Sequence, residues 1–181
     1  MDLEHKFCRL DGAGVTVTDE AGIEGYASLF GETDQGGDAV APGAYAASLA
    51  RLTGGGRSVK LLWQHDPAQP IGVWDEIRED ARGLFVRGRL LPGVARACEA
   101  LELLRAGAID GLSIGYRTRR ARKTEGGGRL LTELELWEVS LVTFPMLSSA
   151  RVAAKGDDPE TAAWRGMAQA LGALRREMAG G

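Results

Sequence analysis

The sequence predicts a strand-rich α+β domain that is followed by a short helical appendage. Its 181 residues suit one domain, and the 44% of hydrophobic residues provide enough apolar side chains for one core. The 26 glycines are about twice the average usage, which favours many turns and short strands over a helical bundle. Segments such as 58–64 and 111–116 place apolar side chains at alternate positions, with the period of a strand.

The expected elements follow from these local patterns. Strands are expected at residues 6–10, 14–18, 22–31, 58–64, 71–77, 83–90, 111–116 and 130–144. One helix is expected to open at Pro42 and a second to cover residues 92–106, where apolar side chains recur at helical spacing before Gly107. Residues 155–160 are expected to form a polar linker and residues 161–178 a third, amphipathic helix. The expected domains are therefore 1–154 and 155–181.

Charge and composition disfavour several classes of partner. A net charge of −3 favours neither nucleic acid nor an anionic membrane as the main partner. Cys8 and Cys98 have no metal-ligand spacing and form no disulfide framework, so we expect no metal and no cofactor. The N-terminus lacks the apolar core of a signal peptide, and no run approaches the roughly 18 apolar residues of a membrane span, which predicts a soluble intracellular chain. Five of the residues 117–123 are basic, and we expect them to form a solvated hairpin arm.

Ser113 and His65 are the first two candidates for catalytic side chains. Ser113 lies between Gly111 and Gly115 in a predicted strand, which leaves the backbone beside it open to close approach. His65 is the only histidine outside the N-terminal segment, and we expect it at the end of the strand 58–64 because an Asp-Pro pair follows. Taken singly, each has a structural explanation: a strand serine beside a bulge glycine, and a structural histidine at a strand end.

Glu138 is the third candidate. It falls in phase with Leu134 and Leu136 on an apolar strand face, where a carboxylate is costly unless something pairs with it. The alternative is a β-bulge that shifts the phase of the strand. Together the three groups are the parts of an acyl-transfer site, in which serine attacks, imidazole removes its proton and the third group orients the imidazolium. The order His65, Ser113, Glu138 differs from the serine–acid–histidine order of enzymes with a nucleophile elbow, so the Gly-x-Ser-x-Gly pattern of residues 111–115 is not interpreted as such an elbow.

At these residues the chain resembles the prohead proteases of HK97-type tailed phages, which also occur in phage-derived gene transfer agents. The resemblance covers roughly residues 20–152, with the blocks in the family's order. The matching blocks are Gly25-Tyr26-Ala27, Val40-Ala41-Pro42-Gly43-Ala44-Tyr45, Leu61-Leu62-Trp63-Gln64-His65-Asp66, Pro70-Ile71-Gly72, Gly107-Ala108-Ile109-Asp110-Gly111-Leu112-Ser113-Ile114-Gly115-Tyr116 and Glu138-Val139-Ser140-Leu141-Val142-Thr143-Phe144-Pro145.

The resemblance implies a fold similar to the herpesvirus assembly proteases, a small closed β-barrel decorated by helices. It implies that His65 is the catalytic histidine and Ser113 the nucleophile. The herpesvirus relatives have a second histidine 25 positions after the serine as the third member, and in this chain Glu138 stands there. We expect Glu138 to orient His65 rather than Asp66, whose side chain points to the opposite strand face, or Asp110, which precedes a turn.

The resemblance also implies the function. We expect a serine endopeptidase that processes the major capsid protein or its scaffolding segment inside the immature capsid, in the cytoplasm of the bacterial host. Self-cleavage near the linker 155–160 is a further expectation, and self-association into a homo-oligomer is left open. The alternatives are a catalytically inactive assembly or scaffolding protein with the same barrel, and a nucleic-acid-binding barrel that uses the basic residues 117–123.

Overall fold

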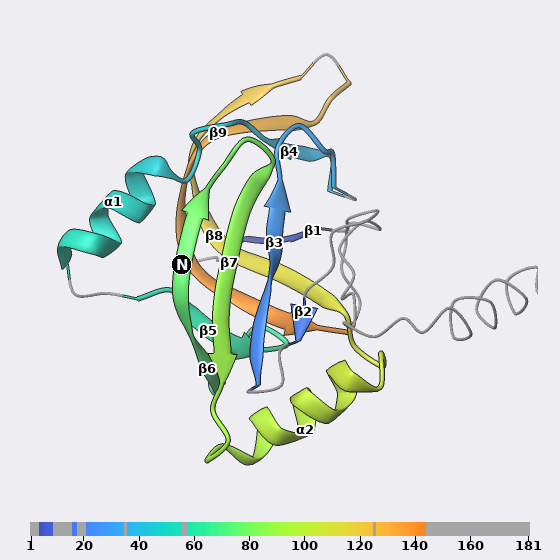
Figure 1. Cartoon of the computed structure of the whole chain (residues 1–181). Coiled ribbons are helices and arrows are strands. Elements are labelled where there is room, and N and C mark those ends of the chain that lie inside the picture. The colour runs from blue at the N-terminus through green and yellow to red at the C-terminus, as the bar shows by residue number, and fades with distance from the viewer. Residues whose placement is uncertain are drawn as a thin grey trace, which may run out of the picture.

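The computed structural model shows one strongly curled sheet with two helices packed against it (Figure 1). The expected linker and helix within 155–181 lie outside the described residues, as does the end of the predicted strand 130–144. Neither helix of the described part is long and apolar enough to cross a membrane. The structure describes residues 4–8, 16–17, 21–34, 36–55, 58–124 and 126–143.

The elements agree with the sequence prediction in type and order, except for the short strand β4, which was not predicted. The helices are α1 (Ala46–Gly55) and α2 (Ala95–Arg105). The strands are β1 (Glu4–Cys8), β2 (Thr16–Val17), β3 (Gly22–Leu29), β4 (Asp38–Val40), β5 (Lys60–Trp63), β6 (Asp66–Glu79), β7 (Gly83–Leu90), β8 (Gly111–Lys123) and β9 (Arg129–Val142). Across the sheet the strands follow the order β1, β8, β9, β5, β6, β7, β3, β2, and β4 pairs with β9 off this path.

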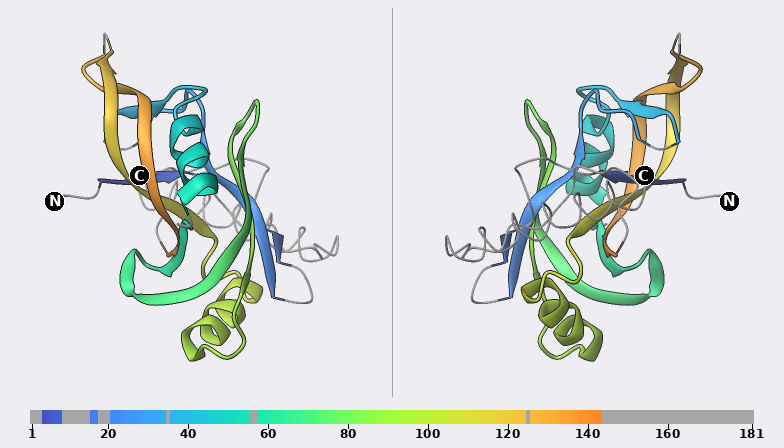
Figure 2. Two further views of the ribbon diagram at one scale, coloured as in Figure 1. Left: turned by 90° about the vertical axis from the view of Figure 1, so that its left-hand side faces the viewer. Right: turned by 90° about the vertical axis from the view of Figure 1, so that its right-hand side faces the viewer.

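The sheet curls into a half-barrel with an apolar interior. Figure 2 shows β8 and β9 on one side and β7 and β3 on the other. Residues of β3 approach β1 and β8 across the open side, but these strands are not hydrogen-bonded neighbours in the described sheet. The closed barrel that the resemblance implies is therefore not shown. The core between the walls includes Ile23, Leu61, Ile71, Leu84, Ile114, Leu134 and Val139.

Helix α1 begins later than expected. Gly43 has φ 84°, a conformation that side-chain-bearing residues rarely adopt, so the chain turns here and the helix starts only at Ala46. The helix packs against β9, where the buried Ser48 accepts a hydrogen bond of 2.9 Å from the backbone N–H of Leu136. Helix α2 lies at one end of the half-barrel (Figure 1) and was predicted to within three residues at its start and one at its end.

The long hairpin of β8 and β9 carries the basic residues of segment 117–123. Residues 119–123 at the outer end of β8 are exposed, and Arg117 and Arg120 pair in register with Glu135 and Glu133 of β9. Arg119 forms an ion pair with Glu135, and Arg120 lies 3.2 Å from Glu133. The expectation of a solvated hairpin arm is confirmed.

Candidate active site

Ser113 lies near the start of β8, where the strand is paired on both sides. Its register partner on β9 is Ser140, and its partner on β1 is Phe7. Leu112 and Ile114 belong to the core, so the alternation of the strand turns Ser113 to the other face of the sheet. The serine has 0% of its surface exposed, and β1 occupies the outer edge of its strand.

A β-bulge in β9 determines the face on which Glu138 lies. Cross-strand pairing passes from Gly115–Glu138 to Tyr116–Leu136, so Trp137 is an extra residue on β9. The bulge reverses the alternation of the strand. Before it the core residues are Leu134 and Leu136, and after it they are Val139 and Leu141. The prediction that Glu138 shares the face of the leucines is therefore wrong. The bulge that we considered as the alternative is what the structure contains.

Glu138 is nevertheless buried, because the opposite face of the sheet is also covered here. Only 6% of its surface is exposed. Cross-strand pairs point to the same face of a sheet, so Glu138 lies on the side that carries Ser113 and Ser140. The bulge thus places an acidic side chain on the face of the candidate nucleophile.

Gly115 provides the space that the Glu138 side chain occupies. A methyl group at position 115 would lie 2.8 Å from the Cδ atom of Glu138 and 2.9 Å from its Cγ atom, and it would also collide with the carboxylate oxygen. Such separations are well below van der Waals contact. The glycine beside Ser113 was predicted to permit a close approach, and the group that approaches is the carboxylate of the third candidate residue.

His65 lies in a two-residue turn between β5 and β6. Trp63 pairs with Asp66, and both turn residues have positive φ, 52° at Gln64 and 62° at His65, as in a type I′ hairpin. The prediction that the Asp-Pro pair ends the strand pairing is wrong. Between Trp63–Asp66 and the next pair of the ladder the register jumps, so Pro67 lies in a stretch where its missing N–H interrupts no ladder bond.

The side chains of His65 and Glu138 are in direct contact. His65 Nδ1 lies 2.5 Å from Glu138 Oε1, and the two side chains are 14% and 7% exposed. Ser140 donates a hydrogen bond of 2.5 Å to the other carboxylate oxygen, and its Oγ accepts the backbone N–H of His65 at 3.2 Å. Because Nδ1 is directed at the carboxylate, the Nε2 edge of the ring is directed away from it.

The other acid next to His65 is engaged in local bonds. Asp66 Oδ1 accepts the backbone N–H of Ala68 at 2.8 Å, and Oδ2 accepts the side-chain amide of Gln69 at 3.1 Å. Asp66 therefore stabilises the start of β6 in the conformation seen here.

Gln64 and Thr143 are parts of this region that the sequence did not single out. The backbone N–H of Gln64 donates to the carbonyl of Leu141 at 2.9 Å. Its side-chain amide donates to Thr143 Oγ1 at 2.6 Å and accepts the Thr143 backbone N–H at 3.3 Å. These bonds attach the turn to the end of β9. The available signals were the position of Gln64 beside the histidine and the i, i+2 spacing of Ser140 from Glu138.

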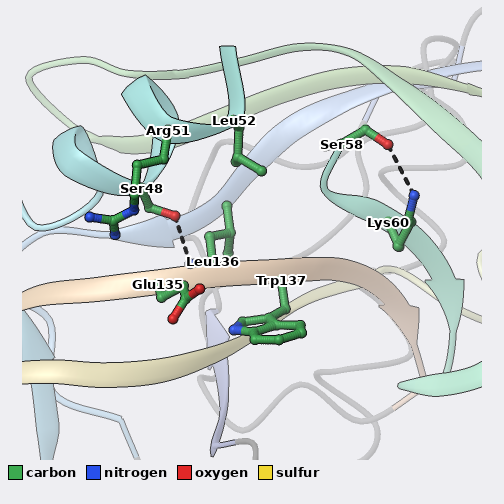
Figure 3. Close-up of a pocket in the computed structure, with 8 residues that line it drawn as sticks. All are labelled: Ser48, Arg51, Leu52, Ser58, Lys60, Glu135, Leu136 and Trp137. Atoms are coloured by element: carbon green, nitrogen blue, oxygen red, sulfur yellow. Dashed lines mark hydrogen bonds between the residues drawn. The ribbon is translucent and has the colours of Figure 1, made fainter. Parts of the chain in front are cut away.

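A recess of about 450 Å³ lies between α1, β5 and β9 (Figure 3). Its walls carry cationic, anionic and aromatic side chains, including Arg51, Glu135 and the 38% exposed Trp137. Trp137 precedes Glu138 in the chain, and Lys60 is the register partner of Glu138 on β5. None of the three candidate catalytic residues lines the recess.

Two sequence relatives are viral proteins of capsid formation. The family described as caudovirus prohead serine protease matches residues 11–163. The prohead protease of Enterobacteria phage HK97 is 37% identical over 135 residues, which are 73% of this chain and 59% of that protein. The capsid polyprotein of Pseudomonas phage PAJU2 is 31% identical over 101 residues, 52% of this chain and 15% of the polyprotein. The chain thus spans less than two thirds of either relative.

A solved structure shares the fold. The bacteriophage T4 capsid assembly protease, gp21, superposes with a TM-score of 0.64, covering 80% of this chain and 98% of that one. The sequence identity is 15%, so this likeness concerns the fold alone.

Proposed function

This chain belongs to the caudovirus prohead serine proteases, and on that premise we propose that it is a serine endopeptidase of capsid maturation. Its substrate is the major capsid protein or the scaffolding segment of that protein. It acts inside the immature capsid, in the cytoplasm of the bacterial host. A related segment within a capsid polyprotein supports this substrate class.

In the proposed mechanism, Ser113 Oγ attacks the scissile carbonyl and His65 accepts the hydroxyl proton. The Nε2 atom takes this proton, because Nδ1 is directed at Glu138. The imidazolium next gives the proton to the leaving amine, and an acyl-enzyme forms on Ser113. Water then hydrolyses this ester by the same proton transfers. Glu138 orients the ring and stabilises the imidazolium.

The observation that carries the proposal is the bond of 2.5 Å between His65 Nδ1 and Glu138 Oε1, on the sheet face that also carries Ser113. A buried carboxylate and an imidazole held in this way suit a general base that becomes positively charged during the reaction. The alternative of a nucleic-acid-binding barrel finds less support, because Arg119 and Arg120 of the basic arm are paired with acidic side chains.

Co-expression with the major capsid protein of the same phage or phage-like particle tests the proposal against an inactive assembly protein. Intact-mass analysis should show truncated capsid protein with the wild type and full-length capsid protein with Ser113→Ala, because loss of a triad member costs several powers of ten in rate. The matched control is Ser28→Ala, which removes another fully buried strand hydroxyl, one without a hydrogen-bond partner in the described part of the chain. Normal processing by a folded Ser113→Ala variant would refute a serine protease.

The same spectra test the expected self-cleavage. The mass of the wild-type chain should fall by a C-terminal segment that begins near residues 155–160, whereas Ser113→Ala should keep its full mass. Equal masses of the two chains under assembly conditions would exclude it.

A further inference from the structure

We propose that Ser140 is a positioning residue of the active site, which fixes both the carboxylate of Glu138 and the backbone of His65. This inference rests on the proposed function. Ser140 does not contact the reacting atoms in our mechanism, and it acts through the two residues that it binds. No catalytic role for Ser140 follows from its place in the block 138–145 or from the relatives described above.

The hydrogen-bonding capacity of a hydroxyl determines what Ser140 does. A serine hydroxyl has one donor and two acceptor positions, an ionised carboxylate only accepts, and a backbone N–H only donates. The 2.5 Å bond to Glu138 Oε2 must therefore use the hydroxyl proton, and the 3.2 Å bond from the His65 N–H must use an oxygen lone pair. These two bonds fix the orientation of the hydroxyl. Because Ser140 holds Oε2, the other carboxylate oxygen of Glu138, Oε1, is directed at His65 Nδ1.

The backbone of His65 needs such support. Gln64 and His65 adopt consecutive left-handed conformations, which are unfavourable for residues with side chains and persist only where the surroundings stabilise them. Three groups of β9 and the residue that follows it bind this turn: Ser140 Oγ, the carbonyl of Leu141 and the side chain of Thr143. Of these three, Ser140 also binds the carboxylate, so it couples the position of the turn to that of the acid.

Burial makes the coupling difficult to replace. Ser140 is 0% exposed and lies between Leu62 of β5 and Ser113 of β8 in the strand register. Without its hydroxyl, a carboxylate oxygen and a backbone N–H would each lose a partner at a site with little access for water, which costs more than the loss of an exposed bond. The expected effect falls on the chemical step rather than on substrate affinity.

The test measures covalent labelling of Ser113 by a fluorophosphonate reagent, which requires no knowledge of the cleavage sequence. Ser140→Ala should lower the maximal labelling rate about 10- to 100-fold, the range for loss of a hydrogen bond to a charged group, and leave the half-saturating reagent concentration within about 2-fold. Ser140→Thr retains the hydroxyl and should recover most of the rate. The matched control is Ser48→Ala, which removes a buried hydroxyl that also accepts a β9 backbone N–H, but on α1.

A second readout does not depend on activity. The proton on His65 Nδ1 gives a far-downfield NMR resonance when it is held by a carboxylate, and Ser140→Ala should shift or broaden this signal, whereas Ser48→Ala should not. An unchanged labelling rate or an unchanged resonance in Ser140→Ala would overturn the inference. Should Ser140→Ala not fold, Ser140→Thr decides: labelling and resonance near the wild type support the inference, and loss of both in a folded Ser140→Thr variant contradicts it.

Failure of the proposed function has a different signature. A wild-type chain that is not labelled at Ser113 and does not cleave capsid protein would refute the serine protease. The Nδ1 resonance would still report whether Ser140 holds Glu138 against His65.

Discussion

Glu138 and Asp80 are two carboxylates with similar hydrogen-bond partners and different surroundings. Glu138 accepts the Ser140 hydroxyl and faces the ring nitrogen of His65. Asp80, in the turn between β6 and β7, accepts the Tyr26 hydroxyl at 2.7 Å and an Arg78 guanidinium N–H at 2.8 Å. Each acid therefore joins an oxygen donor and a nitrogen group from separate parts of the chain.

The difference lies in what the nitrogen partner can do. Arg78 stays charged and Asp80 also accepts the backbone N–H of Arg82 at 2.8 Å, so this cluster has a single protonation state near neutral pH. Burial alone would raise the pKa of Asp80, but the hydrogen bonds from Tyr26, Arg82 and Arg78 outweigh it and lower the pKa from 3.8 to about 2. An imidazole can accept and release a proton during a reaction. The chemistry of the partner, rather than the number of bonds, thus distinguishes the acid that we propose to orient a general base from the acid that only stabilises the fold.

The largest expected effect comes from Glu138→Gln. The amide keeps the size of the side chain and loses the charge, so turnover should fall by about 10² to 10⁴ while the fold is retained. Asp80→Asn, the equivalent change at the structural acid, should leave turnover within about 2-fold. Cleavage rates of the capsid protein measure both. Asp66→Asn should also lose less turnover than Glu138→Gln. Equal losses of turnover in these three variants would remove the distinction between the clusters around Glu138 and Asp80.

A smaller effect on the same carboxylate is expected from Gly115→Ala. The added methyl would meet the Glu138 side chain at 2.8 Å from Cδ, so the acid must move away from His65 or the strands must separate. We expect turnover to fall about 10- to 100-fold and stability to fall by about 1–3 kcal/mol, as for overpacking in a core. The control Gly126→Ala, with no atom within 4 Å of the added carbon, should change neither. Wild-type turnover in Gly115→Ala would show that catalysis does not depend on the position that the Glu138 side chain has beside Gly115.

The smallest effect is expected from Asp80→Asn on stability. The folded pKa of Asp80 is depressed, so its contribution is present above pH 4 and is lost as the pH falls toward 2. We expect Asp80→Asn to cost about 1 kcal/mol at pH 7, less than full linkage would give because a quarter of the side chain is exposed. Urea unfolding of both proteins at pH 7, 5 and 3 should show a difference that narrows between pH 5 and 3. A difference in the free energy of unfolding that stays constant over this pH range would contradict the low pKa of Asp80 in the folded protein.

The sequence predicted most elements, because their signals are local. The alternation around Ser113 and the helical repeat of 95–105 each depend on neighbouring residues, and both elements are present. The face of β9 on which Glu138 lies could not be predicted from such local signals. A bulge at Trp137 is defined by pairing with β8, which a single strand sequence does not reveal.

The sequence predicted which residues belong to the candidate site but not how they are arranged in space. His65 and Glu138 were chosen from scarcity, burial cost and resemblance, and the structure places them in contact. The left-handed turn at Gln64 and the double role of Ser140 could not be predicted, since both depend on hydrogen bonds to β9 across more than 70 residues of chain. The strand break expected at Asp66 does not occur, because a local proline rule takes no account of a ladder that skips residues 67–69.

The burial of Ser113 has a kinetic consequence. With 0% of its surface exposed, the residue can meet a carbonyl or a reagent only in conformations other than the one seen here. The observed rate of any reaction at Ser113 is then the product of its intrinsic reactivity and the fraction of molecules in an open conformation. Two variants with identical chemistry can therefore differ in rate when they differ only in how often the strand beside the serine moves aside.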